Sequence, residues 1–169
     1  MEYEAWYQSP LGRIYLTCVD EGLRGLWFEG QRYFAAGTGE TRTMEHHPVL
    51  LEAAAWLDAY FSGQRPQSHP PLHPSGTAFQ LQVWKELLRI PYGASVSYGE
   101  IARRMGETSA RAVGGAIGRN HISLIVPCHR VVGADGSLTG YAGGTERKAW
   151  LLEWERAHGS GRKEAEDIV

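Results

Sequence analysis

Four of the eight prolines of this 169-residue chain lie within twelve residues, in the stretch RPQSHPPLHPSG at 65–76. Proline fixes φ and lacks an amide hydrogen, so this stretch can be neither a helix interior nor a central strand. It predicts a stiff, extended linker. We therefore expect two domains: an N-terminal β/α domain over residues 1–76, which ends in this linker, and a second domain over residues 77–169.

The first part of the chain predicts a small antiparallel sheet and one helix. Residues 15–18 and 23–28 are rich in the aromatic and β-branched side chains typical of strands. Proline and glycine at 9–12, and glycine at 20–22, predict the turns between strands. Residues 48–61 begin with proline, carry apolar side chains at helical spacing and are followed by glycine, which predicts a helix.

The second part of the chain, residues 77–169, is predicted to be mostly helical. Thr77 and Ser97 each stand three residues before Gln or Glu, the capping-box pattern of a helix start. Helices are expected at residues 77–89, 97–106, 109–119 and 145–157. The second and third, separated by a turn at Gly106–Glu107–Thr108, form a helix-turn-helix pattern. The predicted fold class is α/β in the α+β sense, a small N-terminal antiparallel sheet with a helix followed by a helical domain.

Net charge is −2, which argues against nucleic-acid binding through overall charge. The distribution points the other way, because residues 81–130 carry 7 basic and 3 acidic side chains, whereas residues 1–80 carry 5 and 9. No apolar run approaches the roughly 18 residues of a membrane helix, and the N-terminus does not have the form of a signal peptide. We expect a cytoplasmic protein with no membrane partner.

Cys128 is the sharpest candidate for chemistry. A strand expected at 122–126 runs into Pro127, and His129 and Arg130 follow the cysteine. A thiolate is the reactive form of cysteine, and a neighbouring histidine or arginine lowers the thiol pKa. The alternative is a buried structural cysteine. Adjacent residues of an extended chain point to opposite sides, so His129 can serve Cys128 only if the backbone turns there.

The region around Cys128 resembles the active-site signature of the O6-alkylguanine-DNA alkyltransferases (methylated-DNA–protein-cysteine methyltransferases). The resemblance covers about residues 77–157 and, more weakly, the turn at 9–12. Its motifs, in order, are SYGEIA at 97–102, ARAVGGA at 110–116, Asn120, VPCHRV at 126–131, Gly140-Tyr141, Gly143-Gly144 and the helix from Trp150 to Glu155. Each piece is weak alone, but the ordered set is specific.

The resemblance implies repair of DNA by an irreversible, stoichiometric transfer of an alkyl group from O6 of guanine to Cys128, with transfer from O4 of thymine left open. His129 would take the thiol proton through water, Glu155 would orient His129, and Tyr141 would donate a proton toward the departing guanine. From residue type alone, Glu155 reads as an exposed helix-end carboxylate and Tyr141 as a loop aromatic.

The resemblance also implies that the lesion base is flipped out of double-stranded DNA. The helix at 109–119 would enter the minor groove, with Arg111 filling the gap left by the flipped base. Tyr98 would crowd the neighbouring phosphate, and Asn120 would bridge this helix to the segment bearing Cys128.

Small residues on the same helix would allow the DNA to approach closely, chiefly Gly114 and Gly115. Otherwise glycines simply weaken a helix. Arg103, Arg104 and Arg119 are candidates for phosphate contacts, and solvated helix charges are the equal alternative.

No cofactor is implied. Some relatives carry a structural zinc, but Val19 and Arg24 stand where two of its ligands would align, so we predict no metal. The protein is expected to be a single-turnover transferase and a monomer, with cooperative assembly on DNA left open. Two rival functions are an alkylation-sensing helix-turn-helix regulator and a cysteine hydrolase using Cys128.

Overall fold

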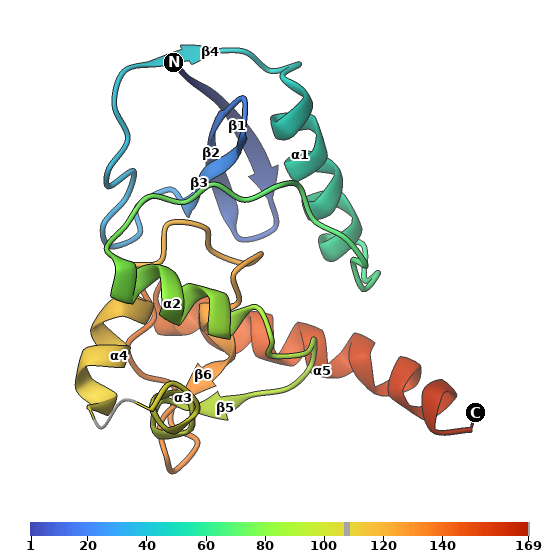
Figure 1. The fold of residues 1–169 in the computed structure, drawn as a ribbon. Helices are drawn as coiled ribbons and strands as arrows, with labels where there is room; N and C mark the ends of the chain where they lie inside the picture. The colour runs from blue at the N-terminus through green and yellow to red at the C-terminus, as the bar shows by residue number, and fades with distance from the viewer. Residues whose placement is uncertain (107–108, 169) are drawn as a thin grey trace.

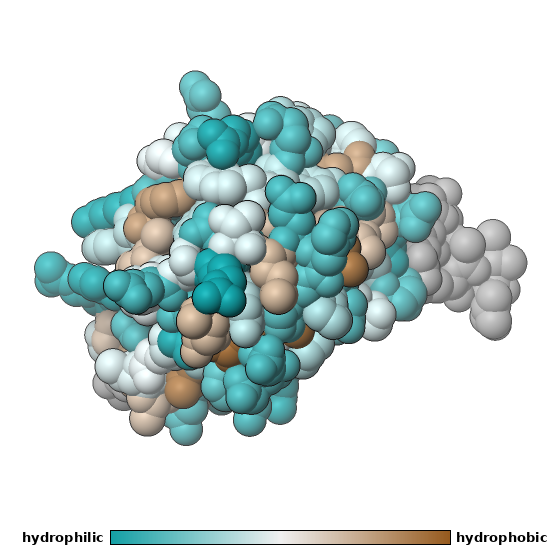
Figure 2. Space-filling view, turned by 90° about the horizontal axis from the view of Figure 1, so that it is seen from above, coloured by the Kyte–Doolittle hydropathy of each residue, from teal (hydrophilic) through white to brown (hydrophobic). Residues whose placement is uncertain are grey.

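The computed structural model describes residues 1–106 and 109–168, with side chains as far as Gly159. The sheet and helix α1 form one layer, and helices α2–α5 form a second layer beneath it (Figure 1). The linker at 65–76 runs between the two. The face seen from above, over the first layer, is mostly polar with scattered apolar residues (Figure 2).

Strands β1 (Glu2–Ser9), β2 (Gly12–Val19) and β3 (Gly22–Phe28) form the expected antiparallel sheet. The turn between β1 and β2 is closed by the Ser9 hydroxyl, which donates to the Gly12 carbonyl at 2.6 Å. A short strand not expected from the sequence, β4 (Thr41–Thr43), pairs in parallel with β1 and makes the strand order β3-β2-β1-β4.

Helix α1 (Pro48–Phe61) has the predicted bounds. Pro48 occupies its first turn, where no amide hydrogen is needed, and His47 caps it by accepting from the Val49 amide at 3.1 Å. The helix packs one face against the sheet. That buried face consists of Val49, Leu50, Ala53, Leu57 and Tyr60.

The proline-rich segment is extended, as predicted, but it is not a free spacer. The Leu23 amide donates to the Pro71 carbonyl and the His73 amide donates to the Leu23 carbonyl, both at 2.8 Å. Gly22 sits against this segment, and a Cβ there would lie 2.7 Å from the Pro71 oxygen. The linker is therefore fixed to β3.

The helix-turn-helix is formed by α3 (Tyr98–Arg104) and α4 (Ala110–Gly118), and α2 (Ala78–Leu87) packs against both. Thr77 and Gln80 form the capping box of α2. Ser97 and Ser109 cap α3 and α4 by accepting an amide hydrogen bond three residues on. Glu107 and Thr108, which fall in the predicted turn, lie outside the described residues.

Two further elements complete the second layer. Strands β5 (Val96–Ser97) and β6 (Val131–Val132) pair in parallel and were not expected. Helix α5 begins at Thr145, as predicted, and runs to Ile168, eleven residues past the expected end at Ala157. Among the described residues, no helix combines the length and apolar character needed to cross a lipid bilayer.

The buried apolar side chains of both layers form one continuous core. Leu26 of β3 joins the layers directly: its amide donates to the His121 carbonyl at 2.8 Å, and its carbonyl accepts from the Ser123 amide at 2.9 Å. These bonds place the sheet immediately beside the segment that leads to Cys128.

Candidate active site

The backbone turns sharply at Cys128. The strand expected at 122–126 is wrong: this segment is a series of turns, with Leu124 in the left-handed region at φ 71°. Cys128–Arg130 then form a single turn of 3-10 helix, η1. Cys128 therefore does not lie at the end of a strand, and the turn that His129 requires is present.

Asn120 ties Cys128 to the end of α4. Its Nδ2 lies 3.2 Å from the Cys128 Sγ and also donates to the Val126 carbonyl at 2.9 Å and the Ile122 carbonyl at 3.2 Å. Its Oδ1 accepts from the Ile122 amide at 3.0 Å. The Asn120 amide thus curls residues 122–126 and points a donor at the sulfur. Cys128 as a whole is only 4% exposed.

His129 and Glu155 form a fully buried pair, with Nε2 2.6 Å from Oε2. An ionised carboxylate can only accept, so Nε2 carries the hydrogen and Nδ1 is left as an acceptor. Nδ1 is buried and has no hydrogen-bond partner among the described residues. Glu155 is therefore not the exposed helix-end carboxylate that its residue type suggests.

Four donors besides His129 reach the Glu155 carboxylate. Arg130 donates from Nε at 2.8 Å and from Nη2 at 3.1 Å, the Tyr60 hydroxyl donates at 2.7 Å, and the Gly93 amide donates at 3.1 Å. Arg130 thus serves Glu155 rather than the thiol. Neither the contact of Tyr60 nor the role of Arg130 is predictable from the sequence, because these contacts join residues far apart in the chain.

The environment sets the resting protonation states. Burial raises the pKa of the Cys128 thiol, with the Asn120 hydrogen bond and the Lys148 charge acting in the opposite direction. Burial also lowers the pKa of His129, against the pull of Glu155. Burial disfavours the Glu155 anion, but its two basic partners outweigh this and hold the pKa of the carboxyl well below its usual range. The resting site holds a thiol, a neutral imidazole and a carboxylate.

Lys148 is a second residue that sequence reasoning missed. It is fully buried on α5, and its Nζ donates to the Thr139 carbonyl at 2.9 Å. Burial lowers the pKa of Lys148, while Cys128 acts to raise it. A lysine in the first turn of a predicted amphipathic helix reads as solvated, and no local pattern marks it as buried.

Two tyrosines flank the loop that follows β6. Tyr98 donates to the Thr139 carbonyl at 2.8 Å, and a Cβ at Gly140 would lie 3.0 Å from its hydroxyl. The Tyr141 hydroxyl is buried without a hydrogen-bond partner among the described residues, and its ring lies 6.4 Å from that of His129. Burial raises the pKa of Tyr141 well above 10, so it is a neutral phenol.

The two glycines of α4 have different surroundings. A Cβ at Gly114 would contact the Tyr98 ring at 3.6 Å, whereas nothing lies within 4 Å of one at Gly115. Arg111 is exposed on the same helix. Gly114 thus lets α4 sit close to Tyr98, and Gly115 leaves a bare backbone surface beside Arg111.

The three candidate phosphate contacts are engaged within the protein. Arg103 and Arg104 both pair with Glu100 on α3, at 2.7 and 3.2 Å. Arg119 stacks on Tyr33, with its guanidinium 4.5 Å from the ring centre.

A pocket of about 330 Å³ opens beside α4, lined by residues that include Arg32, Tyr33, Gly114, Arg119 and Tyr141.

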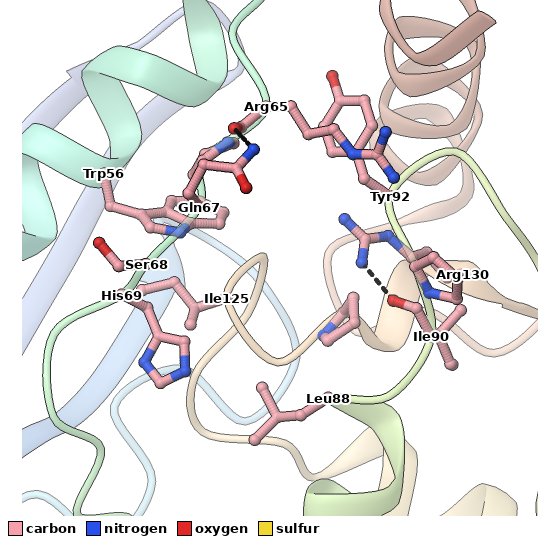
Figure 3. A pocket seen from close by; sticks show the side chains of 13 residues that line it. Trp56, Arg65, Gln67, Ser68, His69, Leu88, Ile90, Tyr92, Ile125 and Arg130 are labelled. Carbon is pink, nitrogen blue, oxygen red and sulfur yellow. Dashed lines mark hydrogen bonds between the residues drawn. The ribbon is translucent and has the colours of Figure 1, made fainter. Parts of the chain in front are cut away.

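A second pocket, of about 270 Å³, lies where the linker meets the second layer (Figure 3). Arg130 lines it and donates from Nη1 to the Ile90 carbonyl at 2.8 Å. Trp56, Arg65 and Tyr92 line it as well. Cys128 does not, so this pocket is not where the sulfur would meet a substrate.

Within the described ranges, no three His, Cys, Asp or Glu side chains are grouped so as to hold a metal ion. Cys18, the other cysteine, is a buried free thiol in the sheet. Burial raises its pKa to about 12, which makes it a poor nucleophile.

Comparison with known families covers nearly the whole chain. Residues 78–157 match "6-O-methylguanine DNA methyltransferase, DNA binding domain", and residues 3–74 match "6-O-methylguanine DNA methyltransferase, ribonuclease-like domain".

Individual relatives agree. The methylated-DNA–protein-cysteine methyltransferase of Mycobacterium tuberculosis is 56% identical over 150 residues, which are 88% of this chain and 89% of the relative. That of Methanosarcina acetivorans is 44% identical over 90% of this chain and 97% of the relative. The crystal structure of M. tuberculosis OGT in complex with DNA superposes with a TM-score of 0.84, at 41% identity, over 92% of this chain and 94% of that one.

Proposed function

The chain belongs to the 6-O-methylguanine DNA methyltransferase family, and we propose that it repairs DNA by moving an alkyl group from O6 of guanine onto the sulfur of Cys128. The observation that carries this assignment is the buried array in which Asn120 points at the sulfur and Glu155 holds His129 with its Nδ1 free. This is the order of nucleophile, base and orienting group.

The array supports a direct displacement. His129 Nδ1 takes the thiol proton through a water molecule. The Glu155 carboxylate, which Arg130 helps to keep ionised, stabilises the imidazolium that results. The thiolate, held by the Asn120 hydrogen bond and the Lys148 charge, attacks the alkyl carbon. A carbon–sulfur bond forms as the carbon–O6 bond breaks, and the electron pair goes to guanine. Tyr141, a neutral phenol, gives its proton to guanine as guanine leaves. The proton held by His129 returns to the Tyr141 phenolate through solvent, so the thiol proton is finally carried by guanine.

Burial of Cys128 requires the target base to leave the duplex. A base stacked in DNA cannot reach a residue that is 4% exposed. Arg111, exposed on α4, would occupy the vacated space, and the bare backbone at Gly115 would meet the minor groove. Tyr98 would press on the neighbouring phosphate from the edge of the same surface.

The partner is DNA, as it is for the M. tuberculosis structure with DNA. We propose double-stranded DNA bearing O6-alkylguanine, with O4-alkylthymine as a further substrate, bound by a monomer that can assemble along the duplex. Arg103, Arg104 and Arg119 would contact phosphates by exchanging their internal partners for the backbone. DNA as partner supports a cytoplasmic location.

We also infer that residues 1–76 and 77–169 are two domains, with the linker at about 65–76 belonging to the first. Support comes from the two family matches, which fall on either side of this boundary. The continuous core and the bonds to Leu26 mean that the two domains are packed rather than tethered.

The test is a titration of the protein with O6-methylguanine duplex, followed by mass spectrometry. One added methylene on the peptide that contains Cys128, with transfer reaching a plateau at one group per protein, supports the proposal. A cysteine hydrolase would continue past one equivalent, and a DNA-binding regulator would transfer nothing.

A further inference from the structure

We infer that Tyr60, on α1 of the first layer, is a positioning residue for alkyl transfer: its hydroxyl sets the orientation and strength of the Glu155–His129 contact. This inference rests on the proposed function only for its kinetic consequence. The contact itself joins a helix of the N-terminal domain to the catalytic carboxylate, across 95 residues of chain.

Tyr60 and His129 bind the same carboxylate oxygen. The Tyr60 hydroxyl lies 2.7 Å from Glu155 Oε2, and His129 Nε2 lies 2.6 Å from it. Arg130 Nε and the Gly93 amide bind the other oxygen, Oε1. Arg130 Nη2 also reaches Oε2, at 3.1 Å, so Tyr60, His129 and Arg130 share that oxygen and the carboxylate is held on both sides.

The Tyr60 ring cannot turn away from this contact. It is fully buried, with Trp56 stacked on it at 5.2 Å and Phe61 and Tyr92 edge-on at 5.1 and 6.0 Å. Burial, with the neighbouring Glu155 charge, raises the pKa of Tyr60 well above 10, so the phenol keeps its proton. Tyr60 is therefore a permanent donor in a fixed position.

A permanent donor on Oε2 reduces how strongly that oxygen attracts the His129 proton. Removing the hydroxyl makes Glu155 a better partner for imidazolium, and the pKa of His129 rises. His129 would then be protonated, and unable to accept the thiol proton, at a higher pH. The acid limb of the transfer rate should move upward accordingly.

Tyr60→Phe and Tyr92→Phe form a matched pair. Both lose one buried hydroxyl from adjacent rings, but the Tyr92 hydroxyl has no hydrogen-bond partner among the described residues. Transfer from O6-methylguanine duplex is measured in single turnover between pH 5 and 9 with the full-length protein. The acid limb should rise by half a pH unit or more for Tyr60→Phe, about a threefold change in the protonation equilibrium, and stay in place for Tyr92→Phe.

The His129 ring is titrated by NMR in the same proteins without DNA. This readout separates the inference from the proposed function. If wild-type protein transfers no alkyl group, the function is wrong, but a higher His129 pKa in Tyr60→Phe alone still supports the role of Tyr60. Equal His129 pKa values in all three proteins, or equal shifts in both variants, would overturn it.

A fluorinated tyrosine at position 60 covers the case in which Tyr60→Phe does not fold. Fluorination keeps the ring and hydroxyl but makes the phenol a stronger donor. The acid limb and the His129 pKa should then move downward, opposite to Tyr60→Phe. An upward shift or no shift would also overturn the inference.

Discussion

Replacing Glu155 by glutamine should destabilise the protein far more than its size suggests. Five donors point at the carboxylate, from His129, Tyr60, Gly93 and twice from Arg130. A glutamine amide has one oxygen and one NH₂ group. Its NH₂ group would therefore lie against hydrogen-bond donors of the protein and accept from none of them. The Arg130 cation would also stay buried without a counter-charge.

The expected loss in the free energy of unfolding follows from the burial of the Arg130–Glu155 ion pair. Breaking a buried ion pair by removing one partner costs about 3–5 kcal/mol, a large share of the roughly 5–15 kcal/mol that keeps a domain folded. For a urea dependence of about 2 kcal/mol per molar, the unfolding midpoint should fall by about 2 M.

Urea unfolding, followed by circular dichroism, measures this. Glu153→Gln is the control, because Glu153 lies on the same helix and also pairs with an arginine, Arg156, but on the exposed side. It should leave the midpoint unchanged. A Glu155→Gln midpoint within 0.5 M (roughly 1 kcal/mol) of wild type, or one matched by Glu153→Gln, would refute the reasoning.

A double variant checks the cause. Adding Arg130→Met to Glu155→Gln removes the stranded cation and keeps much of the volume. It should recover part of the lost stability. If the two losses simply add, the unpaired charge is not their source.

Four further predictions follow from the site. Cys128→Ala should abolish transfer but keep binding to O6-methylguanine duplex; methylation found on Cys18 instead would contradict the assignment. Arg111→Ala and Tyr98→Ala should slow repair of duplex by tenfold or more, since flipping costs a few kcal/mol, and spare free O6-benzylguanine; equal losses on both substrates would place these residues in chemistry or folding. Burial lowers the pKa of His129, so the transfer rate should stay constant as the pH falls to about 6.5, the ordinary pKa of histidine, and decline only below it. A midpoint above pH 7 in a pH–rate profile would mean that His129 is protonated in the resting protein. Alkylation of Cys128 adds volume in a packed region at a cost of about 1–3 kcal/mol, so methylated protein should melt a few degrees lower and benzylated protein lower still, whereas superimposable calorimetric curves would show spare room.

Local signals in the sequence were sufficient for most of the fold. Pro48, Thr77, Ser97 and Ser109 act on their own first helical turns, so the helix starts were predictable. The β-branched composition of residues 122–126 favours a strand, which the structure does not form there. The Asn120 side chain binds two of their carbonyls and curls them, which no local propensity encodes.

The candidate site also contains some residues that the sequence predicts and others that only the fold reveals. An ordered set of motifs makes Cys128, His129 and Glu155 candidates, and the structure brings His129 and Glu155 together at 2.6 Å. Tyr60 fits the apolar face of the helix predicted at residues 48–61, and no local pattern distinguishes Lys148 from a solvated helix charge. Their partners, Glu155 and the Thr139 carbonyl, come from other elements, so only the tertiary fold reveals what they do.

The donors around Glu155 enclose very different lengths of chain. The bond from His129 spans 26 residues, that from Gly93 spans 62 and that from Tyr60 spans 95. Closing the longest of these loops costs about 1 kcal/mol more entropy than closing the shortest, and contacts so distant in sequence are slow to form. The carboxylate is therefore fully held only when the sheet layer has docked on the helices. Until then His129 is not held in its final orientation. The sulfur of Cys128, which can accept an alkyl group only once, is therefore not activated while the chain is still folding.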